Sequence, residues 1–139
     1  MSDRMEMESL VRALYAARVG NDIATVERMF ADDARFEILG SNPAAVKTTG
    51  KRNIVAAAEA LMKTFVMDDL EILALLIDGN RAAVHWRVAI KPAGSGVPVT
   101  ADMIDIVTIE NGLVTALTEI CDSALAMQVA GPAPRLQMA

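Results

Sequence analysis

Cysteine, histidine and aromatic residues are scarce in this sequence of 139 residues. A single cysteine, Cys121, excludes an internal disulfide, and a single histidine, His85, makes a zinc site built from these two residue types very improbable. No glycine-rich phosphate loop or dinucleotide-binding motif is present either. We therefore expect no metal and no cofactor, and a reduced, cytoplasmic protein.

Positive charge is also in deficit, because 13 Lys and Arg residues face 18 Asp and Glu residues. The net charge of −5 gives no basic footprint for nucleic acid. The longest apolar run, Ile72 to Ile77, is far too short to cross a bilayer. The first twenty residues include Asp3, Glu6 and Glu8 and lack the cationic start and apolar stretch of a secretory signal. We expect neither nucleic acid nor a membrane as a partner.

Apolar residues, by contrast, are abundant and make up 53% of the chain, which is enough for one core. Pro- and Gly-rich stretches separate no two blocks that are large enough to fold alone. We predict one domain over residues 1–131 and a short tail over residues 132–139.

The spacing of the apolar residues changes along the chain. Helical spacing predicts helices from residue 2 to Gly20, from Asp22 to about Phe30, and from about Lys51 to Phe65, with a loop at 40–50. Alternation and the turns Asp78-Gly79-Asn80 and Asn111-Gly112 predict strands at 34–38, 70–77, 82–91, 97–110 and 113–121, before a short helix at 123–130. The predicted fold class is α+β, with the helices on one face of a curved antiparallel sheet that forms a cone around a cavity.

Several motifs resemble those of the nuclear-transport-factor-2-like superfamily. They comprise Tyr15-Ala16-Ala17, Asn21-Asp22-Ile23, the run from Met29 to Ala34, the run from Gly50 to Ile54, and the last hairpin with Ile109–Val114 and Glu119–Asp122. The sequence is most similar to the branch of SnoaL-like polyketide cyclases, to which ketosteroid isomerase and limonene epoxide hydrolase are related. The resemblance implies the cone-shaped, cystatin-like fold, which hosts many unrelated activities.

The resemblance also assigns catalytic positions, and the sequence matches them only in part. Of the ketosteroid isomerase groups, Ile38 stands in place of the base, and Leu14 in place of the oxyanion tyrosine, with Tyr15 one residue away. Asp105 matches the oxyanion aspartate, whose proton is retained in an apolar pocket in that enzyme, a known example of this effect.

The epoxide hydrolase pattern is incomplete too. Arg87 and Asp122 match its arginine and late aspartate, but Ala89 replaces the middle aspartate. Its polar pair on the first strand becomes Phe36 and Ile38.

We therefore expect Asp105 to be the principal acid/base, assisted by His85, Arg87 and Asp122. The match of Arg87 favours the His85 face of that strand as the cavity face. The residues expected to contact a ligand are Tyr15, Phe36, Ile38, Phe65, Trp86 and Met103.

Each of these residues also has a structural interpretation. Asp105 could form a salt bridge with Arg87 that orders the sheet, and Asp122 could cap the last helix. His85 and Arg87 could lie on a solvent face or in a dimer interface, and Trp86 in the core.

Three functions remain open at this point. The first is an acid/base isomerase, cyclase or dehydratase acting on a small cyclic or polyketide-like molecule. The second is a non-catalytic module that binds a small apolar molecule in the cavity, and the third is a dimeric accessory domain without a ligand. We also expect a homodimer formed through the outer face of the sheet, because strands that are apolar on both faces need two covers.

Overall fold

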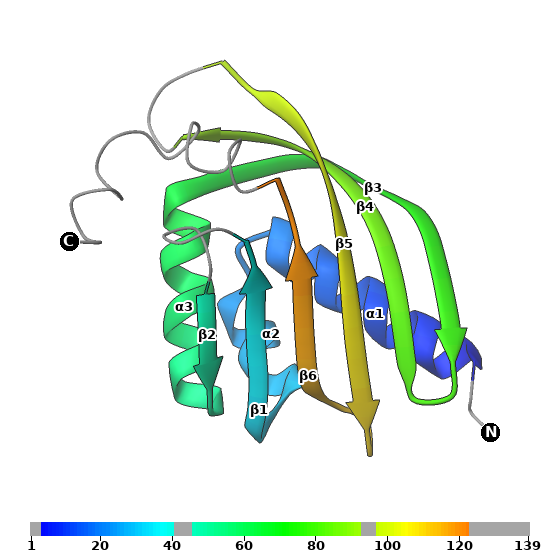
Figure 1. The fold of residues 1–139 in the computed structure, drawn as a ribbon. Coiled ribbons are helices and arrows are strands. Elements are labelled where there is room, and N and C mark those ends of the chain that lie inside the picture. Colours follow the sequence, from blue (N-terminus) through cyan, green and yellow to red (C-terminus); the bar gives the residue numbers. More distant parts are fainter. Residues whose placement is uncertain (1–3, 41–45, 93–96, 123–139) are drawn as a thin grey trace.

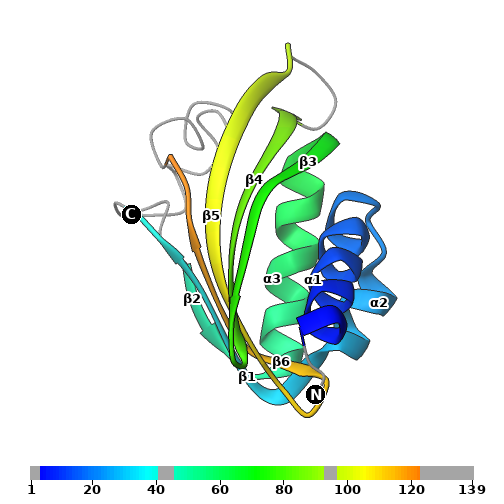
Figure 2. The same cartoon turned by 90° about the vertical axis from the view of Figure 1, so that its right-hand side faces the viewer.

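Three helices cover one face of a curved, six-stranded sheet in the computed structural model, which describes residues 4–40, 46–92 and 97–122 (Figures 1 and 2). Within these ranges the elements follow in the order α1 (Arg4–Val19), α2 (Ile23–Met29), β1 (Phe30–Leu39), β2 (Val46–Thr49), α3 (Lys51–Thr64), β3 (Phe65–Asp78), β4 (Arg81–Pro92), β5 (Val99–Glu110) and β6 (Leu113–Ile120). The predicted α+β class, with the helices gathered on one face, is confirmed. The sheet curves around the helices without closing on itself (Figure 2).

The helices begin and end where their local chemistry requires. Along α1 the buried apolar residues include Met7, Val11 and Leu14, which form one helical stripe. At the start of α2 the N–H of Thr25 donates to Asp22 Oδ1 at 3.2 Å, which is the predicted cap. The third helix begins at Lys51, as predicted.

No helix in the described part of the chain is both long and apolar enough to traverse a lipid bilayer.

The sheet has the strand order β2-β1-β6-β5-β4-β3. All neighbouring pairs are antiparallel except β1 and β6, which are parallel, so the expectation of a purely antiparallel sheet is wrong for this pair. The reason is the path of the chain. After β1 it crosses to the far edge through β2 and α3, and the β3–β6 meander then returns to the centre, where β6 lies beside β1.

Two further details differ from the sequence-based expectation. The edge strand β2 lies in the predicted loop 40–50, because four residues are too few to display a periodicity. Strand β3 begins at Phe65 rather than at residue 70, and the ladder absorbs Asp68 and Asp69 by a register shift, with Asp69 at a φ of 55°. The helix predicted at 123–130 lies outside the described residues.

The two faces of the sheet are chemically different. Val84, Trp86 and Val88 of β4 are buried against the helices, and Met103, Asp105 and Val107 of β5 share that inner face. On the outer face, apolar side chains such as Leu76 (67% exposed), Ile104 (39%) and Ile106 (38%) have no cover within the described chain. The expectation that a second copy covers this face stays a prediction.

If two copies associate through the outer face, light scattering will give a mass near twice 14.8 kDa for the wild type. Ile106→Lys places a charge in the middle of the apolar face and will shift the protein to a monomer. Met5→Lys, at an exposed position on α1, is the control and will leave the mass unchanged. A monomeric wild type at high concentration would contradict the prediction.

Candidate functional site

A cluster of polar side chains lies buried between α1 and the inner face of the sheet. The carboxyl group of Asp105 is 0% exposed and accepts a hydrogen bond from the hydroxyl of Tyr15. Arg18 Nη1 donates to Asp105 Oδ2 at 3.2 Å, and Arg18 Nη2 donates to Glu119 Oε1 at 2.7 Å. One guanidinium group therefore joins two carboxyl groups that come from neighbouring strands.

The register of the last hairpin places these two carboxyl groups together. Asp105 of β5 pairs directly with Glu119 of β6, and both side chains are buried. A register shift beside Thr108 accompanies this pairing: Ile109 pairs with Val114, but Thr108 pairs with Ala116. Like charges directly opposite each other destabilise a sheet, and a cation between them removes the repulsion. Arg18, in the last turn of α1, supplies that cation.

The aromatic rings of Tyr15 and Trp86 pack against the guanidinium group of Arg18. The rings of Tyr15 and Trp86 pack edge to face, with their centroids 5.0 Å apart and their planes at 60°. The guanidinium carbon of Arg18 lies 4.9 Å from the centroid of Trp86 and 5.3 Å from that of Tyr15. Cation–π attraction therefore adds to the hydrogen bonds. Within the described residues, Trp86 Nε1 and Asp105 Oδ1 are buried without a hydrogen-bond partner.

The cluster shifts the protonation of its members. Burial, followed by the charge of Glu119, raises the pKa of Asp105 to about 7, against the opposing effects of Arg18, Tyr15 and Trp86. Although the Trp86 N–H lacks hydrogen-bond geometry, its dipole acts on this carboxyl. Burial acts to lower the pKa of Arg18, but the charges of Glu119 and Asp105 raise it above its ordinary value. Arg18 therefore stays charged, whereas Asp105 holds a proton into the neutral range.

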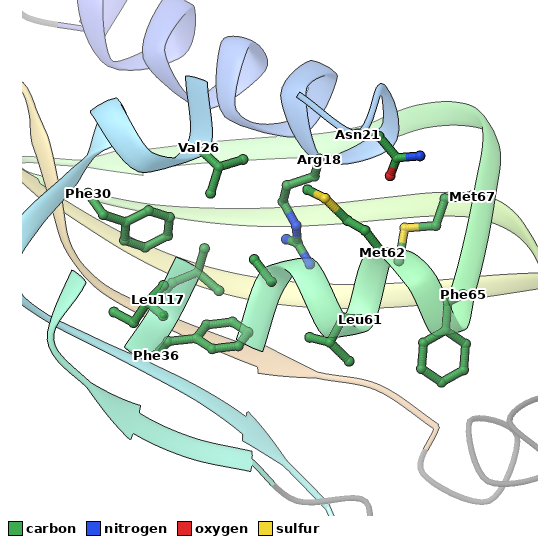
Figure 3. A pocket seen from close by; sticks show the side chains of 12 residues that line it. Arg18, Asn21, Val26, Phe30, Phe36, Leu61, Met62, Phe65, Met67 and Leu117 are labelled. Atoms are coloured by element: carbon green, nitrogen blue, oxygen red, sulfur yellow. The ribbon is translucent and has the colours of Figure 1, made fainter. Parts of the chain in front are cut away.

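A small pocket with a volume of about 40 Å³ lies beside the cluster, between α3 and the sheet (Figure 3). Figure 3 shows Arg18 reaching from α1 into the middle of the apolar side chains that line it. The lining is mostly aliphatic, aromatic and methionine side chains and comprises Arg18, Asn21, Val26, Phe30, Phe36, Ile54, Ala58, Leu61, Met62, Phe65, Met67 and Leu117. Among these described residues, Arg18 is the only charged one.

The predicted ligand contacts divide into three groups. Phe36 and Phe65 line the pocket. Tyr15 and Trp86 belong to the buried cluster and contact Arg18, but they do not line the pocket. Ile38 and Met103 are buried on the inner face but lie outside the pocket lining.

His85 and Arg87 lie on the opposite face of the sheet from Asp105, so the expectation that these residues converge is wrong. The register pairs Val84, not His85, with Asp105. His85 Nε2 and Arg87 Nε lie 2.8 Å from the Oδ2 and Oδ1 oxygens, respectively, of exposed Asp102. The reason is that β4 buries its continuous apolar side, and His85 and Arg87 alternate with it. The salt bridge between Arg87 and Asp105 is also absent, because Arg87 pairs with Asp102 and Arg18 takes that place.

Asp122 is exposed and follows the end of β6. It does not line the pocket. The segment that it was expected to cap lies outside the described residues.

Sequence reasoning missed Arg18 and Glu119. A signal for Arg18 was present, since positions 7, 11, 14 and 18 continue one helical stripe, and an arginine there must face the core. For Glu119 no such signal existed. Uninterrupted alternation from Val114 would place Ala116 and Thr118, not Glu119, on the inner face, and the bulge reverses this assignment.

No group of three or more His, Cys, Asp or Glu side chains is arranged to hold a metal ion within residues 4–40, 46–92 and 97–122. The cluster itself consists of groups that donate, accept or hold a proton. The chemistry that it offers is a fixed guanidinium beside a pocket and a carboxyl group that retains its proton behind it.

Comparison with known families decides the identity of the fold. The family model of the SnoaL-like domain matches residues 11–117. This chain belongs to the SnoaL-like family. No curated protein matches it significantly.

Solved structures similar to this SnoaL-like chain carry different names. A putative isomerase from Bacillus subtilis superposes with a TM-score of 0.83 at 11% identity, covering 93% of this chain and 95% of the other. A putative SnoaL-like polyketide cyclase from Jannaschia sp. CCS1 has a TM-score of 0.77 at 15% identity, covering 95% and 99%. An epoxide hydrolase of the LEH-like type from M. tuberculosis has a TM-score of 0.73 at 18% identity, covering 86% and 85%. These similarities show the fold alone.

Removing the central cation will destabilise the SnoaL-like domain. Arg18→Leu leaves Glu119 and Asp105 facing each other without a cation between them, and we expect a loss of about 3 kcal/mol in the free energy of unfolding. Arg52→Leu, at an exposed position on α3, is the matched control and will change stability by less than about 0.5 kcal/mol. Equal effects of the two variants in denaturant unfolding would show that the cluster contributes nothing.

The raised pKa of Asp105 predicts a pH-dependent difference between the wild type and Asp105→Asn. The folded state keeps the proton up to about pH 7, whereas the unfolded chain releases it near pH 4. Between these values the unfolded state binds fewer protons, so the stability contributed by Asp105 falls as the pH rises. Asparagine does not titrate, so the stability of the variant relative to the wild type will increase with pH across this range.

Denaturant unfolding of both proteins at several pH values measures this difference. Asp33→Asn, at an exposed position on β1, will show no such trend. A relative stability of Asp105→Asn that decreases with rising pH would mean that the carboxyl is already ionised in the folded state.

Proposed function

We propose that this protein binds a small, largely apolar molecule in the pocket beside α3, with Arg18 as the anchor for one oxygen atom of the ligand. The observation that carries the proposal is the single charged side chain in a lining that, apart from Asn21, is otherwise apolar. Such a combination, with many apolar contacts and few fixed polar groups, is typical of ligand sites.

Arg18 has hydrogen-bonding capacity left for a ligand. A guanidinium group carries five N–H donors, and the described bonds to Asp105 and Glu119 use one donor on each terminal nitrogen. The side chain is 14% exposed, so part of it is accessible, and its neighbours fix its direction. A guanidinium that is already held in place loses little conformational entropy when it binds.

The small volume limits the ligand to a compact molecule. A pocket of about 40 Å³ is far smaller than sites for drug-sized ligands, which occupy about 300 Å³ or more. The flexible, unbranched side chains of Met62 and Met67 form part of its wall, and their rotation would enlarge it. A protein of the same fold from Catenulispora acidiphila, with 17% identity, has been solved in complex with trimethylamine, which supports compact ligands for this fold.

Blocking the pocket tests the proposal. Ala58 lines the pocket from α3, and Ala58→Leu fills it without removing a polar group. Ala56→Leu is the same change at an exposed position of the same helix and serves as the control. In ligand-observed NMR with a library of small cyclic ketones, alcohols and esters, the hits for the wild type will lose at least about 90% of their signal with Ala58→Leu and keep it with Ala56→Leu. Hits that both variants retain would bind elsewhere and contradict the proposal.

Acid/base catalysis is the second candidate, and the raised pKa of Asp105 favours it. A carboxyl group that titrates near neutrality is suited to moving a proton at physiological pH. His85 and Arg87 would not take part, since they lie on the outer face. Asp105 is fully buried behind Arg18, so the guanidinium would have to move aside for the carboxyl to reach a ligand.

Exchange of the α-protons of cyclopentanone for deuterium tests this second function. If Asp105 removes a proton next to a bound carbonyl group, the wild type will accelerate the exchange and Asp105→Asn will abolish the acceleration. His85→Asn will leave the rate unchanged. Equal rates with the wild type and Asp105→Asn would leave ligand binding as the function.

A further inference from the structure

We infer that Glu119 determines the charge of the ligand: by balancing Arg18, it makes the pocket select a neutral molecule with an oxygen acceptor and reject a carboxylate. The inference rests on the proposed function and goes one step beyond it. An arginine in a pocket usually indicates an anionic ligand, because guanidinium and carboxylate groups match in geometry and charge. The surroundings of Arg18 lead to the opposite conclusion.

The cluster carries no net positive charge as long as one of its two carboxyl groups is ionised. Arg18 contributes one positive charge, and it contacts Glu119 at 2.7 Å and Asp105 at 3.2 Å. With one carboxyl group ionised the sum is zero, and with both ionised it is negative. A carboxylate entering the pocket would therefore lose its hydration without meeting a net positive charge, which is unfavourable in a mostly apolar lining.

The position of Glu119 makes it the principal counter-charge. It has the shorter of the two contacts to Arg18, and its side chain is only 6% exposed, so solvent screens the pair weakly. The raised pKa of Asp105 means that its carboxyl group is partly neutral at neutral pH and is an incomplete counter-charge for Arg18 there.

Cationic ligands are disfavoured for a different reason. Arg18 is the member of the cluster that lines the pocket, whereas the two carboxyl groups lie behind it. An ammonium group would first meet the guanidinium and its N–H donors, which repel it. A carbonyl, ether or hydroxyl oxygen accepts from these donors and brings no charge of its own.

Three probes of similar size distinguish a neutral, an anionic and a cationic ligand: cyclopentanone, cyclopentanecarboxylate and cyclopentylammonium. Their binding is followed by titration of the Arg18 side-chain Nε–H signal in NMR spectra at neutral pH, with Ala58→Leu as the blocked control. For the wild type we expect cyclopentanone to bind at least about tenfold more tightly than either ion, a factor that corresponds to about 1.4 kcal/mol.

Removal of the counter-charge is the second part of the experiment. Glu119→Gln alone does not leave Arg18 without a counter-charge, because Asp105 can then ionise and pair with the guanidinium. Glu119→Gln combined with Asp105→Asn keeps the hydrogen-bonding oxygens and leaves Arg18 unbalanced. In this double variant the affinity for cyclopentanecarboxylate will rise at least about tenfold, whereas cyclopentanone will change little. Glu59→Gln, an exposed change of the same charge on α3, will leave all three affinities unchanged.

The outcomes separate the inference from the proposed function. If a probe binds at the pocket but the wild type binds the carboxylate or the ammonium as tightly as the ketone, the inference is wrong and the binding function stands. If none of the three binds in a way that Ala58→Leu blocks, the proposed function fails, and the inference fails with it. If the double variant does not fold, the relative affinities of the wild type for the three probes still decide whether the pocket selects a neutral ligand.

Discussion

The salt bridge of Arg18 with two carboxyl groups is the interaction on which the interior depends. Asp105 and Glu119 stand opposite each other on neighbouring strands, under the helices and away from water. Without a cation between them, this register would be unfavourable. The last turn of α1 brings the cation, and the rings of Tyr15 and Trp86 hold it. The same interaction connects the first helix to the last hairpin and places a guanidinium in the pocket.

This arrangement determines which of the residues that match catalytic positions of related families meet in this fold. The resemblance to ketosteroid isomerases places Leu14, not Tyr15, at the oxyanion tyrosine, yet it is Tyr15 that meets Asp105, and its hydroxyl donates to the aspartate itself. Arg18 separates both from the pocket. The carboxyl group of Asp105 thus serves mainly as a hydrogen-bond partner of Arg18. Its pKa is raised, and its proton retained, because the group is buried and lies near Glu119.

Several elements were predictable because their signals are local. The turn Asn111-Gly112, the cap at Asp22 and the start of α3 follow from residue preferences that act over a few positions. The resemblance, carried by short motifs, also led to the correct family. The strand β2 and the parallel pairing of β1 with β6 were not predictable in this way, because both depend on where distant segments meet.

By itself, the sequence determined the α+β class and that Met103, Asp105 and Val107 share one face of β5, because alternation along a strand fixes which side chains lie together. It also limited the polar groups available to the interior. Only the tertiary structure decided which partner Asp105 has and which face of β4 is covered. A single bulge in the last hairpin turns Glu119 inward, and the packing of α1 against the sheet brings Arg18 to it. These outcomes depend on contacts between residues about a hundred positions apart, which no local pattern records.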